Sequence, residues 1–179
     1  MRRTIAIQVK GEDGALKPLT REVLYTHHGP IVATKGGFGY AAALAYADQV
    51  GLGEEMYAMF TSKNLRDVKN ALAMGQLMAQ NVMVTTVEGD IYYRRTGRVP
   101  IRPDGYDYRK PGDGSTSKTE WKGIHPTSDL VQIENPACGW MQNCNVSPRV
   151  MFRDSPLRPE RYKSYLYMEP TRNGFAYGL

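Results

Sequence analysis

Residues 81–97, NVMVTTVEGDIYYRRTG, form the most regular pattern in this 179-residue sequence. Val, Thr, Ile and Tyr, which favour strands, make up most of residues 81–87 and 91–97, on either side of the turn residues EGD, 88–90. An acidic residue and a glycine between two such runs are typical of a tight turn. The sequence therefore predicts an antiparallel β-hairpin here.

A second hairpin is predicted at the start of the sequence. Ile5, Ile7 and Val9 alternate with polar residues, which places them on one face of a strand. A turn follows at residues 11–14, and a second extended run covers residues 18–26.

Two shorter strands are predicted next. Residues 27–30, HHGP, break the hairpin, and residues 31–34 form a short strand that ends at the turn KGG, 35–37. The alanine-rich apolar run at residues 40–47 is interpreted as a buried strand.

The helical region covers residues 53–78. Asn64 is a plausible N-cap, with Asp67 in the first turn that follows. Apolar and other residues then recur at helical spacing, at Leu65, Val68, Leu72 and Gln76. This pattern predicts one amphipathic helix over residues 64–78 that lies on a sheet.

The remaining sequence is less regular. Residues 98–136 are rich in Pro, Gly, Asp and Ser and are interpreted as a long loop. Residues 139–145 are interpreted as a short strand, and residues 156–179 as a basic, aromatic tail without a clear partner. Together these elements predict an α+β fold of mostly antiparallel strands with one main covering helix.

Composition excludes several classes of protein. The sequence is 41% hydrophobic and 23% charged, as in globular proteins, and its net charge is +5. The basic residues are scattered, so we do not expect nucleic-acid binding, although a basic polyanion-binding protein remains an alternative. We expect no membrane span and no signal peptide, because no apolar run is long enough. Cys138 and Cys144 are too few for a disulfide scaffold.

Histidines offer little chemistry at the level of sequence. His27, His28 and His125 have no carboxylate or cysteine at metal-ligand spacing, so no metal or cofactor is expected. The adjacent pair could act as a base and its orienter, but such pairs at a strand end are more often structural. The sequence also has no nucleophile elbow and no phosphate loop.

Three amides within four residues, Gln142, Asn143 and Asn145, are the remaining candidates. On an extended strand Asn143 and Asn145 would point to the same face. An amide NH₂ is a neutral donor that can stabilise a developing oxyanion. From the pattern alone, simple capping of backbone groups in a loop is the favoured interpretation.

Six motifs in order, over roughly residues 20 to 150, resemble the penicillin acylase family of N-terminal nucleophile hydrolases. They are THHGPIV (26–32), the predicted helix at 64–78, the hairpin from Asn81, GRVPIR (97–102), PGDG with EWKG (111–114 and 120–123), and NPACGWMQNCN (135–145). The hairpin departs from the family only locally, at residues 84–87, where the family has Tyr-Ala-Asp. The Gln-Asn-x-Asn form at 142–145 is similar to the cephalosporin acylase and acyl-homoserine-lactone acylase branch.

The resemblance implies part of a four-layer αββα sandwich, with residues 1–179 as a single partial domain from the centre of the large subunit. It implies that Asn145 supplies the side-chain amide of the oxyanion hole. The family nucleophile is the N-terminal Ser that autocatalytic cleavage exposes, and we expect it outside this sequence. The rest of the large subunit and the small subunit are then the expected partners, and the chain alone is expected to be inactive.

The implied reaction is hydrolysis of a linear amide, which separates an acyl group from an amine as in β-lactam antibiotics or N-acyl homoserine lactones. The resemblance implies no cofactor, and a periplasmic or extracellular location. A non-catalytic binding module on the same scaffold is the other alternative.

Overall fold

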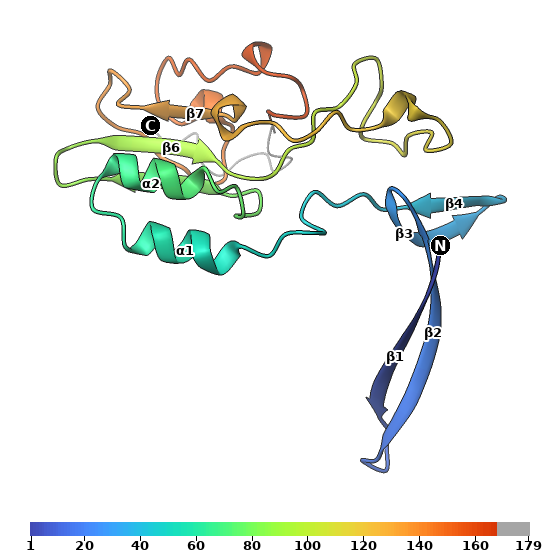
Figure 1. The fold of residues 1–179 in the computed structure, drawn as a ribbon. Coiled ribbons are helices and arrows are strands. Elements are labelled where there is room, and N and C mark those ends of the chain that lie inside the picture. The colour runs from blue at the N-terminus through green and yellow to red at the C-terminus, as the bar shows by residue number, and fades with distance from the viewer. Residues whose placement is uncertain (168–179) are drawn as a thin grey trace. The chain divides into compact units, whose positions relative to one another are not determined.

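The computed structural model describes residues 1–167, which form two compact units. One unit comprises residues 1–44 and 106–120, and the other comprises residues 45–105 with the segment from Trp121 onward. Each unit contains one antiparallel sheet, so the predicted α+β class with antiparallel strands is confirmed (Figure 1).

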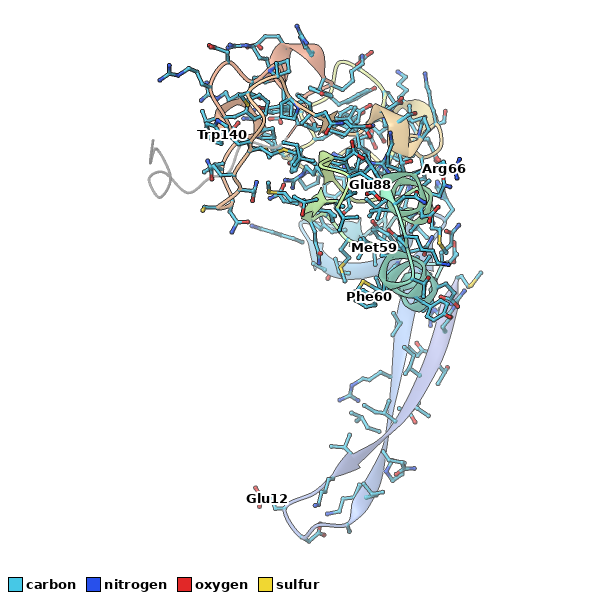
Figure 2. All side chains as sticks on the ribbon, turned by 90° about the vertical axis from the view of Figure 1, so that its left-hand side faces the viewer. Glu12, Met59, Phe60, Arg66, Glu88 and Trp140 are labelled. Carbon is cyan, nitrogen blue, oxygen red and sulfur yellow. The ribbon has the colours of Figure 1, made fainter. Side chains whose placement is uncertain are left out.

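The first unit is a four-stranded sheet in sequential order. Its strands are β1 (Arg2–Lys10), β2 (Leu16–Thr26), β3 (Gly29–Lys35) and β4 (Phe38–Ala41). The predicted first hairpin is confirmed, because β1 pairs with β2 from Arg2↔Leu24 to Lys10↔Leu16. Figure 2 shows side chains projecting from this two-stranded ribbon, with Glu12 at the turn.

One strand of this unit is shorter than predicted. The alanine-rich run at residues 40–47 is extended only as far as Ala41, and residues 42–47 are irregular. Ala42 still donates its N–H to Pro30 O at 2.9 Å, so the segment remains attached to the sheet for one more residue.

The second unit contains the hairpin that the sequence predicted most clearly. β5 (Asn81–Thr85) and β6 (Ile91–Arg95) pair in register from Asn81↔Arg95 to Thr85↔Ile91. A third strand, β7 (Gln132–Glu134), pairs with the other edge of β6. This strand was not predicted, because its three residues are too few for a periodic pattern and lie inside the range 98–136 interpreted as loop.

Two helices stand where one was predicted: α1 (Leu52–Phe60) and α2 (Leu65–Leu72). The hydroxyls of Thr61 and Ser62 donate to backbone carbonyls of α1, which ends that helix. Asn64 then caps α2 as predicted, since its Oδ1 accepts the Asp67 N–H at 3.0 Å and its backbone is extended.

Both faces of β6 are covered, and this sets where the core lies. Tyr92 packs with Leu65, Leu72 and Leu77 on the side of the helices. Tyr93, the next residue, points the other way and packs with Val131, Met151, Phe152, Leu157 and Tyr167. Burial raises the pKa of Tyr93 to about 12, so its hydroxyl stays protonated and donates to Asn81 Oδ1 at 2.8 Å.

The C-terminal segment is therefore not the tail without a partner that was predicted. Leu157, Leu166 and Tyr167 are buried within the second unit. The remainder of the predicted tail, residues 168–179, lies outside the described residues. Among residues 1–167, no helix is both long and apolar enough to cross a membrane.

Candidate functional site

Asn145 lies on an irregular loop between β7 and a following 3₁₀ turn. The N–H of Gln142 donates to Met151 O at 3.0 Å, which closes the base of the loop. Met141 and Val146, on either side of Asn145, pack against the core cluster around Tyr93. These contacts hold one side of the loop that carries Asn145.

A buried tyrosine fixes the far side of the same loop. The Tyr167 hydroxyl accepts the N–H of Arg149 at 3.0 Å and donates to Leu157 O at 2.9 Å. It also lies 3.1 Å from Ser147 Oγ, two residues after Asn145. Sequence reasoning missed this residue, because nothing local in a tail segment indicates which loop it contacts.

The predicted strand over residues 139–145 is wrong. Gly139 has φ 74° and Asn145 has φ 58°, both in the left-handed region, which a strand does not allow. Asn143 and Asn145 therefore do not line one face of a strand. Instead the N–H of Asn145 donates to Asn143 Oδ1 at 3.0 Å, and Asn is one of the few residues other than Gly that accept such a backbone.

The three clustered amides have different roles. Asn143 accepts a backbone N–H, and Gln142 Nε2 donates to Val150 O at 3.4 Å, so both support the loop, as the capping interpretation expected. Asn145 is exposed, and within residues 1–167 its side-chain amide makes no hydrogen bond. Its NH₂ is therefore available to a ligand, and a neutral amide can donate to an oxyanion without giving up a proton.

The structure brings a carboxylate to the histidine pair, which the spacing in the sequence did not show. His27 Nε2 lies 2.7 Å from Glu120 Oε1, although the two residues are 93 positions apart. His28 Nε2 lies 3.0 Å from Gly114 O. Side chains that approach one another only after folding do not show the short spacing by which metal ligands are found in a sequence.

His125 has its own carboxylate partner. Its Nδ1 lies 2.8 Å from Asp129 Oδ2, and its Nε2 lies 3.1 Å from the Tyr165 hydroxyl. The side chain of His125 is only 11% exposed, so this is a structural pair that holds the segment around the 3₁₀ turn Thr127–Asp129.

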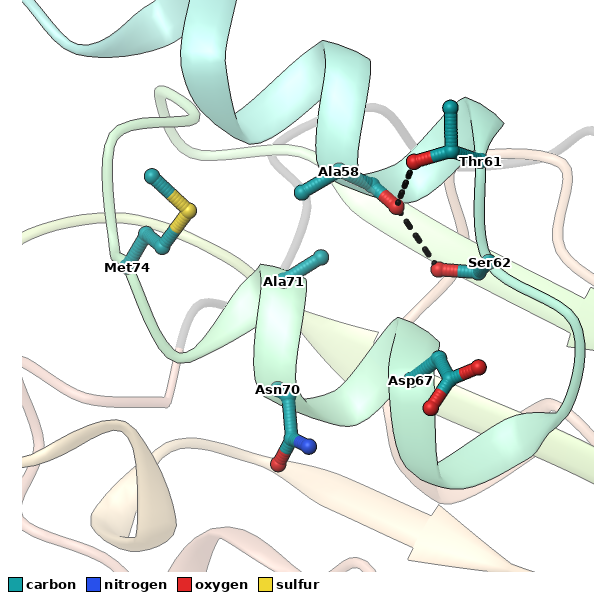
Figure 3. A pocket seen from close by; sticks show the side chains of 7 residues that line it. All are labelled: Ala58, Thr61, Ser62, Asp67, Asn70, Ala71 and Met74. Carbon is teal, nitrogen blue, oxygen red and sulfur yellow. Dashed lines mark hydrogen bonds between the residues drawn. The ribbon is translucent and has the colours of Figure 1, made fainter.

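A pocket of about 360 Å³ lies between the two helices (Figure 3). The Thr61 and Ser62 hydroxyls both donate to Ala58 O, and Asp67 accepts the Lys63 N–H, so its polar groups already serve the helix ends. We assign no chemistry to this pocket. It is lined by Ala58, Thr61, Ser62, Asp67, Asn70, Ala71 and Met74.

The chain is similar to known acylases over part of their length. It is 36% identical over 85 residues to penicillin G acylase of Escherichia coli, which covers 48% of this chain and 10% of the relative. It is 27% identical over 157 residues to the acyl-homoserine lactone acylase PvdQ of Pseudomonas fluorescens (strain Pf0-1), which covers 74% of this chain and 20% of the relative.

The fold is similar to that of the thermostable penicillin G acylase from Alcaligenes faecalis, with a TM-score of 0.70 and 22% identity over 94% of this chain and 29% of that chain. This chain therefore spans less than a third of the length of each of these relatives. Residues 1–177 match the family model described as penicillin amidase, and the chain belongs to that family.

Proposed function

We propose that this chain is part of an amidohydrolase that cleaves linear amides and releases an acyl group from an amine. Membership of the penicillin amidase family supports this reaction class. The names of the relatives suggest two substrate classes, the penicillins and the acyl-homoserine lactones. The Gln-Asn-x-Asn form at residues 142–145 favours the branch that contains the homoserine-lactone acylases.

Asn145 is the proposed donor to the oxyanion. The hydroxyl of a serine outside these 179 residues attacks the amide carbonyl, and the carbonyl oxygen becomes negatively charged. Asn145 Nδ2 and a backbone N–H donate to that oxygen. The α-amine of the same serine takes the hydroxyl proton and passes it to the leaving amine, and water then hydrolyses the acyl-enzyme. The observation that carries the proposal is the exposed side chain of Asn145, free of hydrogen bonds within the described residues, on a loop that is anchored on both sides.

The remaining parts of the enzyme are expected partners. The nucleophile, the backbone donor and most of the acyl pocket would come from the rest of the large subunit and from the small subunit. On this basis the 179-residue chain alone is inactive toward chromogenic acyl-anilides, whereas the intact enzyme hydrolyses them. If neither the chain nor the intact enzyme hydrolyses amides, the result favours the non-catalytic binding module. Family membership also leads us to expect a periplasmic or extracellular location.

Substitution of Asn145 in the intact enzyme tests its role. Asn145→Gly removes the donor, and glycine adopts the observed φ of 58° without strain. Asn145→Ala also removes the donor, but alanine in this left-handed conformation costs about 1–2 kcal/mol. Asn145→Asp keeps the shape of the side chain, removes the NH₂ and adds a negative charge that repels the oxyanion, so its loss should be at least as large as that of Asn145→Gly. We expect each variant to lower kcat by about 10²- to 10³-fold with little change in KM, because the donor acts on the transition state.

Cys144→Ser is the matched control, since Cys144 is the exposed neighbour of Asn145 on the same loop. This variant should keep nearly normal kcat, which separates a catalytic effect from general damage to the loop. Near-normal kcat in both Asn145→Gly and Asn145→Asp would remove Asn145 from the mechanism.

A further inference from the structure

Three side chains with metal-binding atoms meet within the first unit. One ligand atom each from His27, His28 and Glu120 lies within 4.8 Å of the other two. The His27 side chain is 66% exposed and that of Glu120 is 41% exposed, so solvent ions can reach them. The reaction proposed above uses none of these residues, and its mechanism needs no metal.

The turn between β2 and β3 explains how two consecutive histidines come to lie side by side. In a strand, neighbouring side chains point to opposite faces, but residues 27–28 form the turn after β2. The Thr26 hydroxyl fixes this turn, because it accepts the His28 N–H at 3.2 Å and donates to Gly29 O at 3.3 Å. The two imidazole centroids are consequently only 3.8 Å apart.

Hydrogen bonds then orient the rings as supporting contacts do in metal sites. Gly114 O can only accept, so the 3.0 Å contact places a proton on His28 Nε2, and the neutral imidazole then carries its lone pair on Nδ1. A backbone carbonyl is a common partner for the nitrogen that does not bind the metal. Glu120 accepts from His27 Nε2 at 2.7 Å, and a bound cation would replace that shared proton.

We propose that His27, His28 and Glu120 bind one divalent transition-metal ion of the zinc class. Two imidazoles and one carboxylate suit Zn²⁺ and its neighbours, whereas Ca²⁺ and Mg²⁺ prefer sets made of oxygen alone. Donor atoms around a tetrahedral zinc lie about 3.3 Å apart, so ligand atoms that lie within 4.8 Å of one another are at most about 1.5 Å further apart than zinc requires. Three protein ligands leave a fourth position open to water or to a group from another molecule.

Equilibrium dialysis with metal analysis tests the site directly. The intact enzyme, produced without a polyhistidine tag, is stripped with chelator and titrated with Zn²⁺, with Ca²⁺ in parallel. We expect one Zn²⁺ site that depends on His27, His28 and Glu120, and no comparable Ca²⁺ binding there. Glu120→Gln should weaken Zn²⁺ binding by at least about 10-fold, because loss even of a supporting contact costs 10- to 100-fold.

Glu120→Gln also separates a folded site from two adjacent histidines in an unfolded chain, since Glu120 can contribute only when the fold brings it there. His125→Gln is the matched control, because it removes a histidine–carboxylate pair that lacks a second imidazole. It should bind Zn²⁺ as the unsubstituted chain does. Equal Zn²⁺ binding by Glu120→Gln, or by a His27→Ala/His28→Ala double variant, would overturn the proposal.

Chemical modification of the unsubstituted protein gives a second measurement, which does not depend on whether a variant folds. Zn²⁺ should protect His27 and His28 from diethyl pyrocarbonate, and Ca²⁺ at the same concentration should not. Absence of protection by Zn²⁺, or equal protection by Ca²⁺, would contradict the site.

Discussion

Gly29 begins β3 with a backbone conformation that other residues rarely adopt, at φ 143°. A Cβ at this position would lie 2.0 Å from Ala42 O, which is backbone and cannot rotate away. The same approach allows Ala42 N–H to bond to Pro30 O. The glycine of the HGP sequence is thus required for packing within the sheet.

We expect Gly29→Ala to lower the free energy of unfolding of the first unit by about 2–4 kcal/mol, which combines a steric clash with backbone strain. Pulse proteolysis in urea measures the change. Gly37→Ala is the control, because Gly37 has φ 81° but no atom within 4 Å of the added Cβ. A loss no larger than that of Gly37→Ala would show that the contact with Ala42 O relaxes without cost.

Single residues could be predicted from the sequence where their role is local. The side chain of Asn64 accepts the N–H of Asp67, three residues later, and so caps α2. That spacing is visible in the sequence. The contact of Glu120 with His27 depends on the path of the chain over 93 residues and could not be predicted. The role of Asn145 in the oxyanion hole came from the family resemblance rather than from the amide pattern, and it stays a prediction.

Helix α1 is attached to the rest of its unit by a buried carboxylate. Glu55 is fully buried, and its Oε2 accepts the N–H of Gln76 and, at 3.1 Å, that of Leu77. Its Oε1 has no hydrogen-bond partner within residues 1–167. Burial raises the pKa of Glu55 above its ordinary value of 4.5, partly offset by the two N–H groups.

A raised pKa means that the folded chain holds this proton more tightly than the unfolded chain. The contribution of Glu55 to stability is therefore greatest below about pH 4.5 and declines as the pH rises toward the pKa of the folded state. In the intact enzyme, we expect the unfolding free energy of the unsubstituted protein minus that of Glu55→Gln to fall between pH 4 and pH 7.

Urea midpoints at several pH values measure this difference, with Glu54→Gln as the control on the exposed side of the same helix. A difference that stays constant with pH, or that rises with pH, would contradict burial as the dominant influence on Glu55.

Elements were predicted well where their pattern repeats over several residues. Alternation at Ile5, Ile7 and Val9, and strand-favouring residues on both sides of the turn at residues 88–90, predicted the two long hairpins. Alternation is informative because side chains on a strand repeat every two residues. The helical region predicted over residues 53–78 contains two helices. The Thr61 and Ser62 hydroxyls end α1 before the predicted helix begins, and α2 ends at Leu72, six residues before its predicted end. The amide-rich segment 139–145 does not form the predicted strand. Two of its residues have left-handed backbone angles, and no periodic pattern in the sequence indicates such angles.

The chain as a whole exposes apolar side chains that a complete globular domain would cover. Ile5, Ile7 and Val9 of β1 are 41–50% exposed, and they share one face with Leu19 and Val23 of β2. An uncovered apolar face of this kind promotes association.

We therefore expect the isolated chain to be poorly soluble or to form a non-native oligomer, as measured by size-exclusion chromatography with light scattering. Ile5→Thr/Ile7→Thr should reduce association, because Thr keeps strand propensity and removes apolar surface. Gln8→Thr, on the opposite face of β1, is the control. A soluble monomer with a sharp two-state melt would count against the need for further segments.

Binding of a tetrahedral transition-state analogue by the intact enzyme tests the role of Asn145 most directly, because the analogue carries the oxyanion that the amide is proposed to hold. Asn145→Gly should weaken binding of the analogue by about 10²- to 10³-fold and leave the KM for the amide substrate nearly unchanged. Unchanged affinity for the analogue in Asn145→Gly would contradict the assignment of Asn145 to the oxyanion hole.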